Sequence, residues 1–124
     1  MTASIDADGL EDSEPDFDKL LSRVKADFVE SLLQRSIDLE NARVVLDRDG
    51  ATSAGLSTIA DIAHKLAGVA PSFGFHAMGE TALAIDRDLQ TETPPASTRA
   101  VWHRNRDRVE LLLDLMEDAM DGAG

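Results

Sequence analysis

Apolar residues recur at helical spacing in four separate segments of the chain. In the first segment an apolar residue follows every three or four positions from Phe17 to Leu32, with polar residues between. Ser13 followed by Pro15 is typical of a helix start, and "DRDGATSAG" interrupts the pattern after residue 47. With the three later stripes, the sequence predicts helices over residues 16–47, 55–72, 75–91 and 96–121.

The four predicted helices have short connections, which is typical of an all-α, antiparallel up-and-down four-helix bundle. Only 4% of the residues are aromatic, and β-branched residues do not alternate with polar ones, so a sheet is disfavoured. The side chains that we expect to share the core are Phe17, Leu20, Leu21, Val24, Phe28, Leu32, Ile59, Ile62, Ala63, Leu66, Ala70, Phe73, Met78, Ala82, Ile85, Leu89, Val101, Trp102, Asn105, Val109, Leu112, Leu113, Met116 and Ala119.

Charge and composition divide the chain into two expected parts. Its net charge is −12, and seven of its 24 acids lie in residues 1–18, which hold no Lys or Arg. We therefore expect an acidic, disordered leader over residues 1–15 and a bundle over 16–121. An acidic chain without a basic patch predicts no nucleic-acid or membrane-surface partner. With no signal peptide and no membrane span, a cytoplasmic location is expected. With no cysteine, no thiol chemistry is available.

One histidine, in "AHKLAGVAPSFGF" at residues 63–75, falls outside the apolar stripe of its helix. Projected from Ile59, His64 lies at about 140° and Gly68 at about 180°, so both point outward. Small residues surround the imidazole, and a glycine inside a helix costs about 1 kcal/mol relative to alanine. Gly68 therefore indicates close approach of another protein. His76 and His103 are interpreted as ordinary surface residues.

Asp86 is a candidate neighbour of His64. If the second and third helices form a hairpin about Phe75, the two residues lie at the same height, 11 positions on either side of it. The carboxylate could then accept a hydrogen bond from one ring nitrogen and leave the other nitrogen free as a nucleophile. A solvated surface acid is the alternative reading of Asp86.

These residues resemble the motif of histidine-containing phosphotransfer (HPt) domains of bacterial two-component phosphorelays. His64, Leu66, Gly68 and Gly74 stand at its positions, with Ala63 before them, and the likeness extends to "DFVESLLQRSIDLENA" and "LAID". It implies that His64 accepts a phosphoryl group from a receiver-domain aspartate and passes it to another receiver. The partners implied are response-regulator receivers, either free or part of a hybrid histidine kinase.

The resemblance also assigns roles around His64. Asp86 would orient the imidazole, Gly68 would allow the partner to approach, and Lys65 would stabilise phosphate charge. Mg²⁺ would come from the receiver, so this chain would need no cofactor or metal of its own, and it would carry phosphate without kinase activity. Many members have a lysine three residues after the histidine, where this chain has Ala67.

Two alternatives follow from the same residues. An HPt-shaped adaptor that docks a receiver or kinase without carrying phosphate stays open because of Ala67. A metal-binding bundle is disfavoured, because the i, i+3 pair Asp61 and His64 has no second copy. A monomer is favoured, although dimerisation through the first or last helix stays open.

Overall fold

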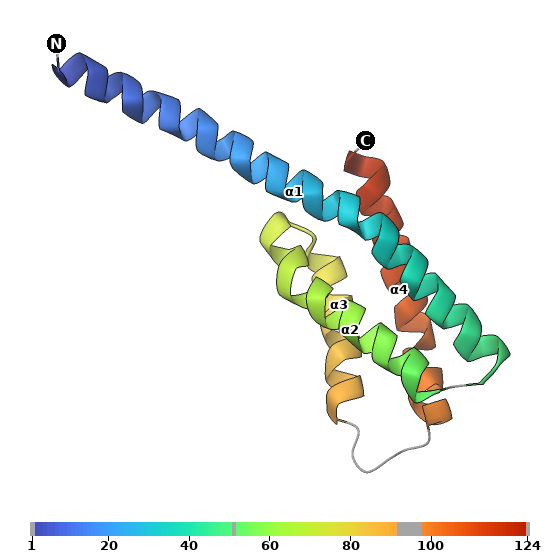
Figure 1. Ribbon diagram of the computed structural model, residues 1–124. Helices are drawn as coiled ribbons and strands as arrows, with labels where there is room; N and C mark the ends of the chain where they lie inside the picture. The colour runs from blue at the N-terminus through green and yellow to red at the C-terminus, as the bar shows by residue number, and fades with distance from the viewer. Residues whose placement is uncertain (1, 51, 92–97, 124) are drawn as a thin grey trace.

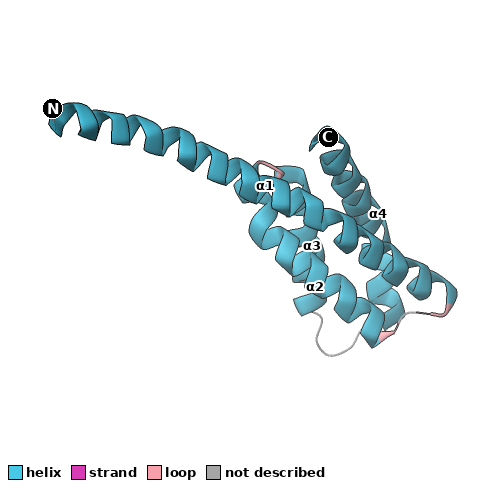
Figure 2. Ribbon diagram, turned by 45° about the horizontal axis from the view of Figure 1, so that its top comes forward, coloured by secondary structure: helices cyan, strands magenta, loops and turns pink. Residues whose placement is uncertain are grey.

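A computed structural model describes the backbone of residues 2–50, 52–91 and 98–123, and the side chains of residues 16–50, 52–90 and 98–122. Helices make up almost all of this part of the chain (Figures 1 and 2). In chain order the elements are α1 (Thr2–Arg48), α2 (Ser53–Val69), the 3₁₀ helix η1 (Ala70–Phe73), α3 (His76–Thr91) and α4 (Thr98–Ala123).

The four α-helices form an antiparallel up-and-down bundle, which confirms the predicted fold class. Helix α1 packs on α2 and α4, and α3 packs on the same two helices from the other side. Figure 1 shows the chain direction reversing from each helix to the next. The bundle therefore exposes one outer face of each helix and buries the opposite face.

Local sequence signals fix both ends of α2. The hydroxyl of Thr52 accepts a hydrogen bond from the backbone N–H of Gly55 at 3.1 Å and caps the helix start. At the other end Pro71 lies in the first turn of η1, because a proline cannot continue the α-helical hydrogen-bonding pattern. Gly74 then takes φ = +88°, a left-handed conformation that favours glycine, and the chain turns into α3.

Helix α3 returns so closely to this turn that one of its residues must be small. A methyl group at Gly79 would overlap the Pro71 ring and would lie only 2.8 Å from its Cδ. Gly79 is buried and its N–H donates to the Phe75 carbonyl at 3.0 Å. The close packing of Gly79 on Pro71 thus sets how α3 leaves the turn.

The core consists of one face from each helix. The predicted stripes of α2, α3 and α4 supply most of it, and Phe28 and Trp102 are buried as expected. Phe28 packs against the rings of Phe73 and Phe75, with centroids 5.3 and 6.0 Å away, so α1 contacts the turn between α2 and α3.

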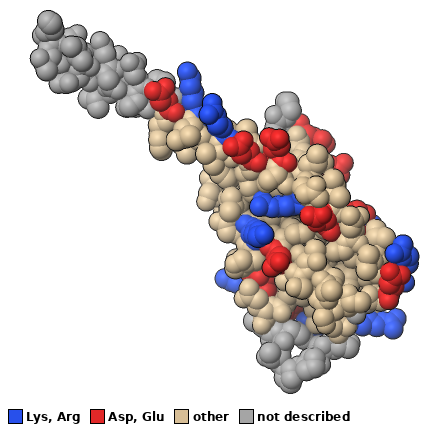
Figure 3. Space-filling model, in the orientation of Figure 1, with Lys and Arg blue, Asp and Glu red and all other residues tan. Residues whose placement is uncertain are grey.

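The expectation for the beginning of α1 is wrong. The helix begins at Thr2 rather than near residue 16, so Ser13 is inside it, because extending a helix avoids the cost of starting a new one. Its 47 residues span about 70 Å, whereas the 17 residues of α2 span about 25 Å. Helix α1 therefore projects beyond the bundle (Figures 1 and 3).

Four predicted core residues lie on this projecting part and are exposed to solvent. The exposed fractions are 59% for Phe17, 55% for Leu20, 47% for Leu21 and 43% for Val24. No other helix in the described part of the chain reaches far enough to cover them. We call residues 16–27, all of which are exposed, the overhang.

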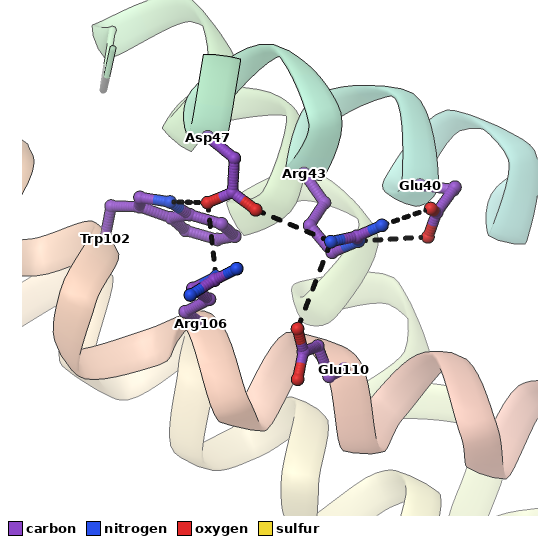
Figure 4. A network of polar contacts seen from close by, with 6 residues as sticks. All are labelled: Glu40, Arg43, Asp47, Trp102, Arg106 and Glu110. Atoms are coloured by element: carbon purple, nitrogen blue, oxygen red, sulfur yellow. Dashed lines mark hydrogen bonds and ion pairs between the residues drawn. The ribbon is translucent and has the colours of Figure 1, made fainter.

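A polar network joins the end of α1 to α4 (Figure 4). The Trp102 indole Nε1 donates to Asp47 at 2.8 Å, and Arg106 pairs with the same carboxylate at 3.2 Å. Arg43 pairs with Asp47 at 3.4 Å and reaches Glu110 on α4 at 3.9 Å. These contacts satisfy the one polar atom of the buried tryptophan and fix the pairing of α1 with α4.

A second cluster joins α3 to α4. Asp88 accepts hydrogen bonds from the buried Asn105 amide at 2.6 Å and from Arg104 at 3.1 Å, and Arg108 lies 3.7 Å away. Desolvation of the carboxylate acts to raise the pKa of Asp88, but the hydrogen bonds from Arg104 and Asn105 and the nearby arginine charges outweigh it and lower that pKa. The ionised carboxylate is therefore part of the folded structure.

Candidate functional site

The rotation of α2 is set by its buried face, and His64 lies on the opposite side. Ile59, Ile62, Ala63 and Leu66 are buried. The His64 side chain is 70% exposed, as the helical projection predicts. A histidine held in this way contributes little to the core, so packing does not explain its position.

Asp86 on α3 contacts the His64 ring. His64 Nδ1 lies 3.1 Å from Asp86 Oδ2, and the aspartate side chain is only 9% exposed. Asp86 is therefore not a solvated surface acid, and the hairpin brings the pair together as the sequence predicts. A carboxylate oxygen accepts a hydrogen bond, so Nδ1 carries the hydrogen and Nε2 presents its lone pair.

Gln90 is a third member of this site that was not predicted from the sequence. Gln90 Nε2 donates to Asp86 Oδ1 at 2.9 Å, so each oxygen of the buried carboxylate has a partner. Asp86 and Gln90 lie four residues apart on α3, a spacing that places their side chains next to each other. This four-residue spacing is the sequence feature that could have predicted the contact between Gln90 and Asp86. Gln90 holds the carboxylate, and the carboxylate holds the imidazole.

Gly68 lies one turn after His64 with open space beside it. A Cβ placed there would meet no atom of the chain within 4 Å, apart from the backbone of its own helix and its two neighbours. The backbone is not in the left-handed region, where glycine is needed. Neither packing nor conformation within the chain therefore accounts for this glycine.

The structure does not join Lys65 to the pair formed by His64 and Asp86. Its exposed side chain lines a groove between α1 and α2, together with Asp38 and Asp61, whereas Asp86 approaches His64 from α3. Lys65 makes no ion pair within the part of the chain that the structure describes. Lys65 therefore lines the α1 side of α2, and none of the described acids pairs with its ammonium group.

Two kinds of feature, a metal site and a membrane-spanning helix, are absent from the described residues. No group of three or more histidine, cysteine, aspartate or glutamate side chains suited to a metal ion is present among the described side chains. Within the same part of the chain, no helix combines the length and hydrophobicity that crossing a membrane requires. His76 and His103 are both exposed.

Comparison with known proteins identifies one family. The family model described as "Hpt domain" matches residues 10–122, which is nearly the whole chain. Neither the curated proteins nor the solved structures contain a match. The matched range includes His64, Asp86 and the turn between α2 and α3.

Proposed function

The chain belongs to the Hpt domain family, and from that premise we propose that His64 is its phosphoacceptor. The family supports a phosphotransfer role in two-component signalling. The finer proposal is that His64 accepts a phosphoryl group from the phosphoaspartate of one receiver domain and passes it to the aspartate of another. The observation that carries it is the exposed imidazole whose Nδ1 is held by the buried Asp86 carboxylate.

This hydrogen bond determines which nitrogen reacts. The Nε2 lone pair attacks phosphorus, the N–P bond forms, and the P–O bond to the receiver carboxylate breaks and leaves its electron pair on that carboxylate. The ring keeps its proton on Nδ1 and becomes positively charged. The adjacent Asp86 carboxylate offsets that charge. Transfer to the next receiver is the same step in reverse.

Phosphate transfer also requires that the receiver approach closely and that the charge on the phosphoryl group be stabilised. Open space at Gly68 lets a receiver come near the α2 backbone beside the imidazole. Lys65, which no acid of the described chain engages, is available to contact a phosphate oxygen or an acidic residue of the docked receiver. The receiver supplies Mg²⁺, which neutralises charge on the transferring group.

An adaptor that docks without transfer is the second candidate. Ala67 favours it, because many family members have a lysine at this position. Ala67 is half-buried and packs against the core, so a lysine there would have to extend outward past its neighbours. The free Nε2 of His64 favours transfer, because a docking surface alone does not need an oriented imidazole.

Transfer from a panel of phosphorylated receiver domains tests the proposal. We expect acid-labile, alkali-stable phosphate on the wild type and none on His64→Gln. The chain has three histidines, so His76→Gln and His103→Gln are matched controls that should transfer normally. Receiver binding without phosphate transfer would favour the adaptor, and phosphate that persists in His64→Gln would exclude His64 as the acceptor.

A further inference from the structure

The overhang carries an apolar face that the chain itself leaves uncovered. Phe17, Leu20, Leu21 and Val24 lie within a sector of about 100° around α1. The same sector contains Phe28, which is buried where the bundle begins. The core face of α1 thus continues beyond the bundle, where no other described side chain buries it. Figure 3 shows charged and uncharged side chains together on this part.

Residues 16–25 of the overhang are a mirror image in their apolar positions and, except at Lys19 and Ser22, an inverted mirror image in their charges. The stretch "DFDKL-LSRVK" has its centre between Leu20 and Leu21. Phe17 and Val24 lie at equal distances on either side of that centre. Asp16 lies as far before it as Lys25 lies after it, and Asp18 corresponds in the same way to Arg23.

Such a sequence can pair with a second copy of itself running in the opposite direction. In a twofold interface, residue i contacts residue j and residue j contacts residue i. With the axis at the centre of the stretch, Leu20 of one copy lies level with Leu21 of the other, and Phe17 lies level with Val24. Each apolar side chain then meets an apolar partner.

The charges select this antiparallel direction. On the helix surface Asp18 and Lys25 lie on one flank of the apolar face, at about 100° and 80° from Phe17. Asp16 and Arg23 lie on the other flank, at about −100° and −120°. The antiparallel pair brings equal flanks together, so Asp18 of one copy lies beside Lys25 of the other, offset by about 3 Å along the axis. The Lys25 ammonium also lies 5.2 Å from the centre of the Phe75 ring in its own chain, on the side where the bundle begins.

On the second flank, Asp16 lies in the same way beside Arg23 of the other copy. A parallel pair would instead bring opposite flanks together. Asp18 would then lie beside Asp16, and Lys25 beside Arg23, which are like charges. Asp27, at about −80°, also lies on the second flank, about 3 Å along the axis from Asp16 of the other copy in the antiparallel pair and from Lys25 of the other copy in a parallel one. The antiparallel direction therefore brings more opposite than like charges together, whereas the parallel direction does the reverse.

We propose that two copies of this chain dimerise through their overhangs, as an antiparallel helix pair about a twofold axis between Leu20 and Leu21. The sequence favours a monomer but leaves dimerisation through the first helix open. In the pair, residue 13 of each copy lies level with Phe28 of the other, where the bundle begins. The proposal does not depend on the chemistry of His64.

The interface is small, so the dimer should be weak. Four apolar side chains from each copy bury much less surface than a standard interface, which corresponds to a dissociation constant on the order of 10–100 µM. Sedimentation equilibrium of the full chain from about 1 µM to 1 mM covers this range. We expect the wild type to change from monomer to dimer, and a monomer at every concentration would overturn the proposal.

A charged substitution locates the interface. Leu21→Glu should leave the chain monomeric throughout the range. The matched control is Leu111→Glu on α4, where the original leucine is exposed to a similar extent, 49% against 47% for Leu21. The control should dimerise like the wild type. A Leu21→Glu variant that still dimerises, or a Leu111→Glu variant that does not, would place the interface elsewhere.

Charge reversal tests the direction of the helices. Asp18→Lys and Lys25→Asp should each raise the dissociation constant about five- to tenfold, because the affected contact occurs twice in the dimer. The double variant exchanges the charges and should recover wild-type affinity. In a parallel dimer Asp18→Lys would tighten association by relieving repulsion from Asp16, and this result would contradict the antiparallel arrangement.

Disulfide formation gives an independent reading of the register, since the chain has no cysteine of its own. A mixture of Phe17→Cys and Val24→Cys chains should form mainly the mixed disulfide, because these positions are level across the interface. Each position is about 10 Å along the axis from its own counterpart. A predominance of 17-to-17 and 24-to-24 disulfides would refute the register.

Discussion

Replacement of Gly68 separates the requirements of folding from those of docking. Because a Cβ at this position meets nothing within 4 Å, alanine has room in the folded chain. Glycine in a helix is less stable than alanine by up to about 1 kcal/mol, so Gly68→Ala should raise the free energy of unfolding by about 0.5–1 kcal/mol. For a domain of this size the melting temperature should rise by about 2–5 °C.

The same substitution should slow phosphate transfer. Added atoms in a closely packed contact cost about 1–3 kcal/mol, and each 1.4 kcal/mol is a factor of ten. A methyl group at Gly68 should therefore lower the second-order rate constant about fivefold, and Gly68→Gln should lower it about 100-fold or more. Rapid-quench measurement of transfer from a phosphorylated receiver gives these rate constants, and thermal unfolding gives the stability.

Gly122→Ala is the matched control. Gly122 is also a helical glycine with nothing within 4 Å of an added Cβ, but it lies at the end of α4. Its replacement should leave the transfer rate unchanged. If Gly68→Gln transfers phosphate within twofold of the wild-type rate, the receiver does not approach α2 at this point and the reasoning about Gly68 fails.

Three further predictions concern other contacts. Asp86→Asn should slow transfer by about 10- to 100-fold in single-turnover assays while the chain stays folded, since it removes the negative charge that offsets the positive charge on the phosphorylated His64 ring. An unchanged rate would deny Asp86 a positioning role. Gly79→Ala should lower the free energy of unfolding in urea by about 1–3 kcal/mol, because the methyl group overlaps Pro71, and a stabilised variant would contradict that packing. Because the folded structure lowers the pKa of Asp88, this carboxylate stabilises the fold above its unfolded pKa, near 3.8, and the stabilisation is lost as pH falls through the folded pKa. Asp88→Asn should therefore flatten the pH dependence of the free energy of unfolding below about pH 4. Equal slopes for both proteins would exclude this contribution.

The bundle and the histidine pair were predictable because both follow from periodicity. The apolar stripe of α2 determines which way His64 points. A hairpin that turns near Phe75 then places Asp86 at the same height. Neither inference needs the exact crossing angle of the helices. Gln90 contacts Asp86 and not the imidazole, so only its four-residue spacing from Asp86 indicates its place in the site.

Periodicity alone could not show where the core ends. The apolar pattern of α1 is the same on both sides of Phe28, so Leu21 and Leu32 look alike in sequence. Only the length of the neighbouring helices decides that one is exposed and the other buried. Likewise, the sequence places Lys65 next to His64 but does not show that its side chain lies toward α1.

The most direct test of the account is to find which nitrogen of which histidine becomes phosphorylated. After transfer from a phosphorylated receiver, ¹⁵N NMR of the histidine side chains detects the coupling between nitrogen and phosphorus. Because Asp86 holds Nδ1 of His64 at 3.1 Å, the account predicts a single N–P coupling, at Nε2 of His64. Phosphate on Nδ1 of His64, on another histidine, or on no histidine would contradict it.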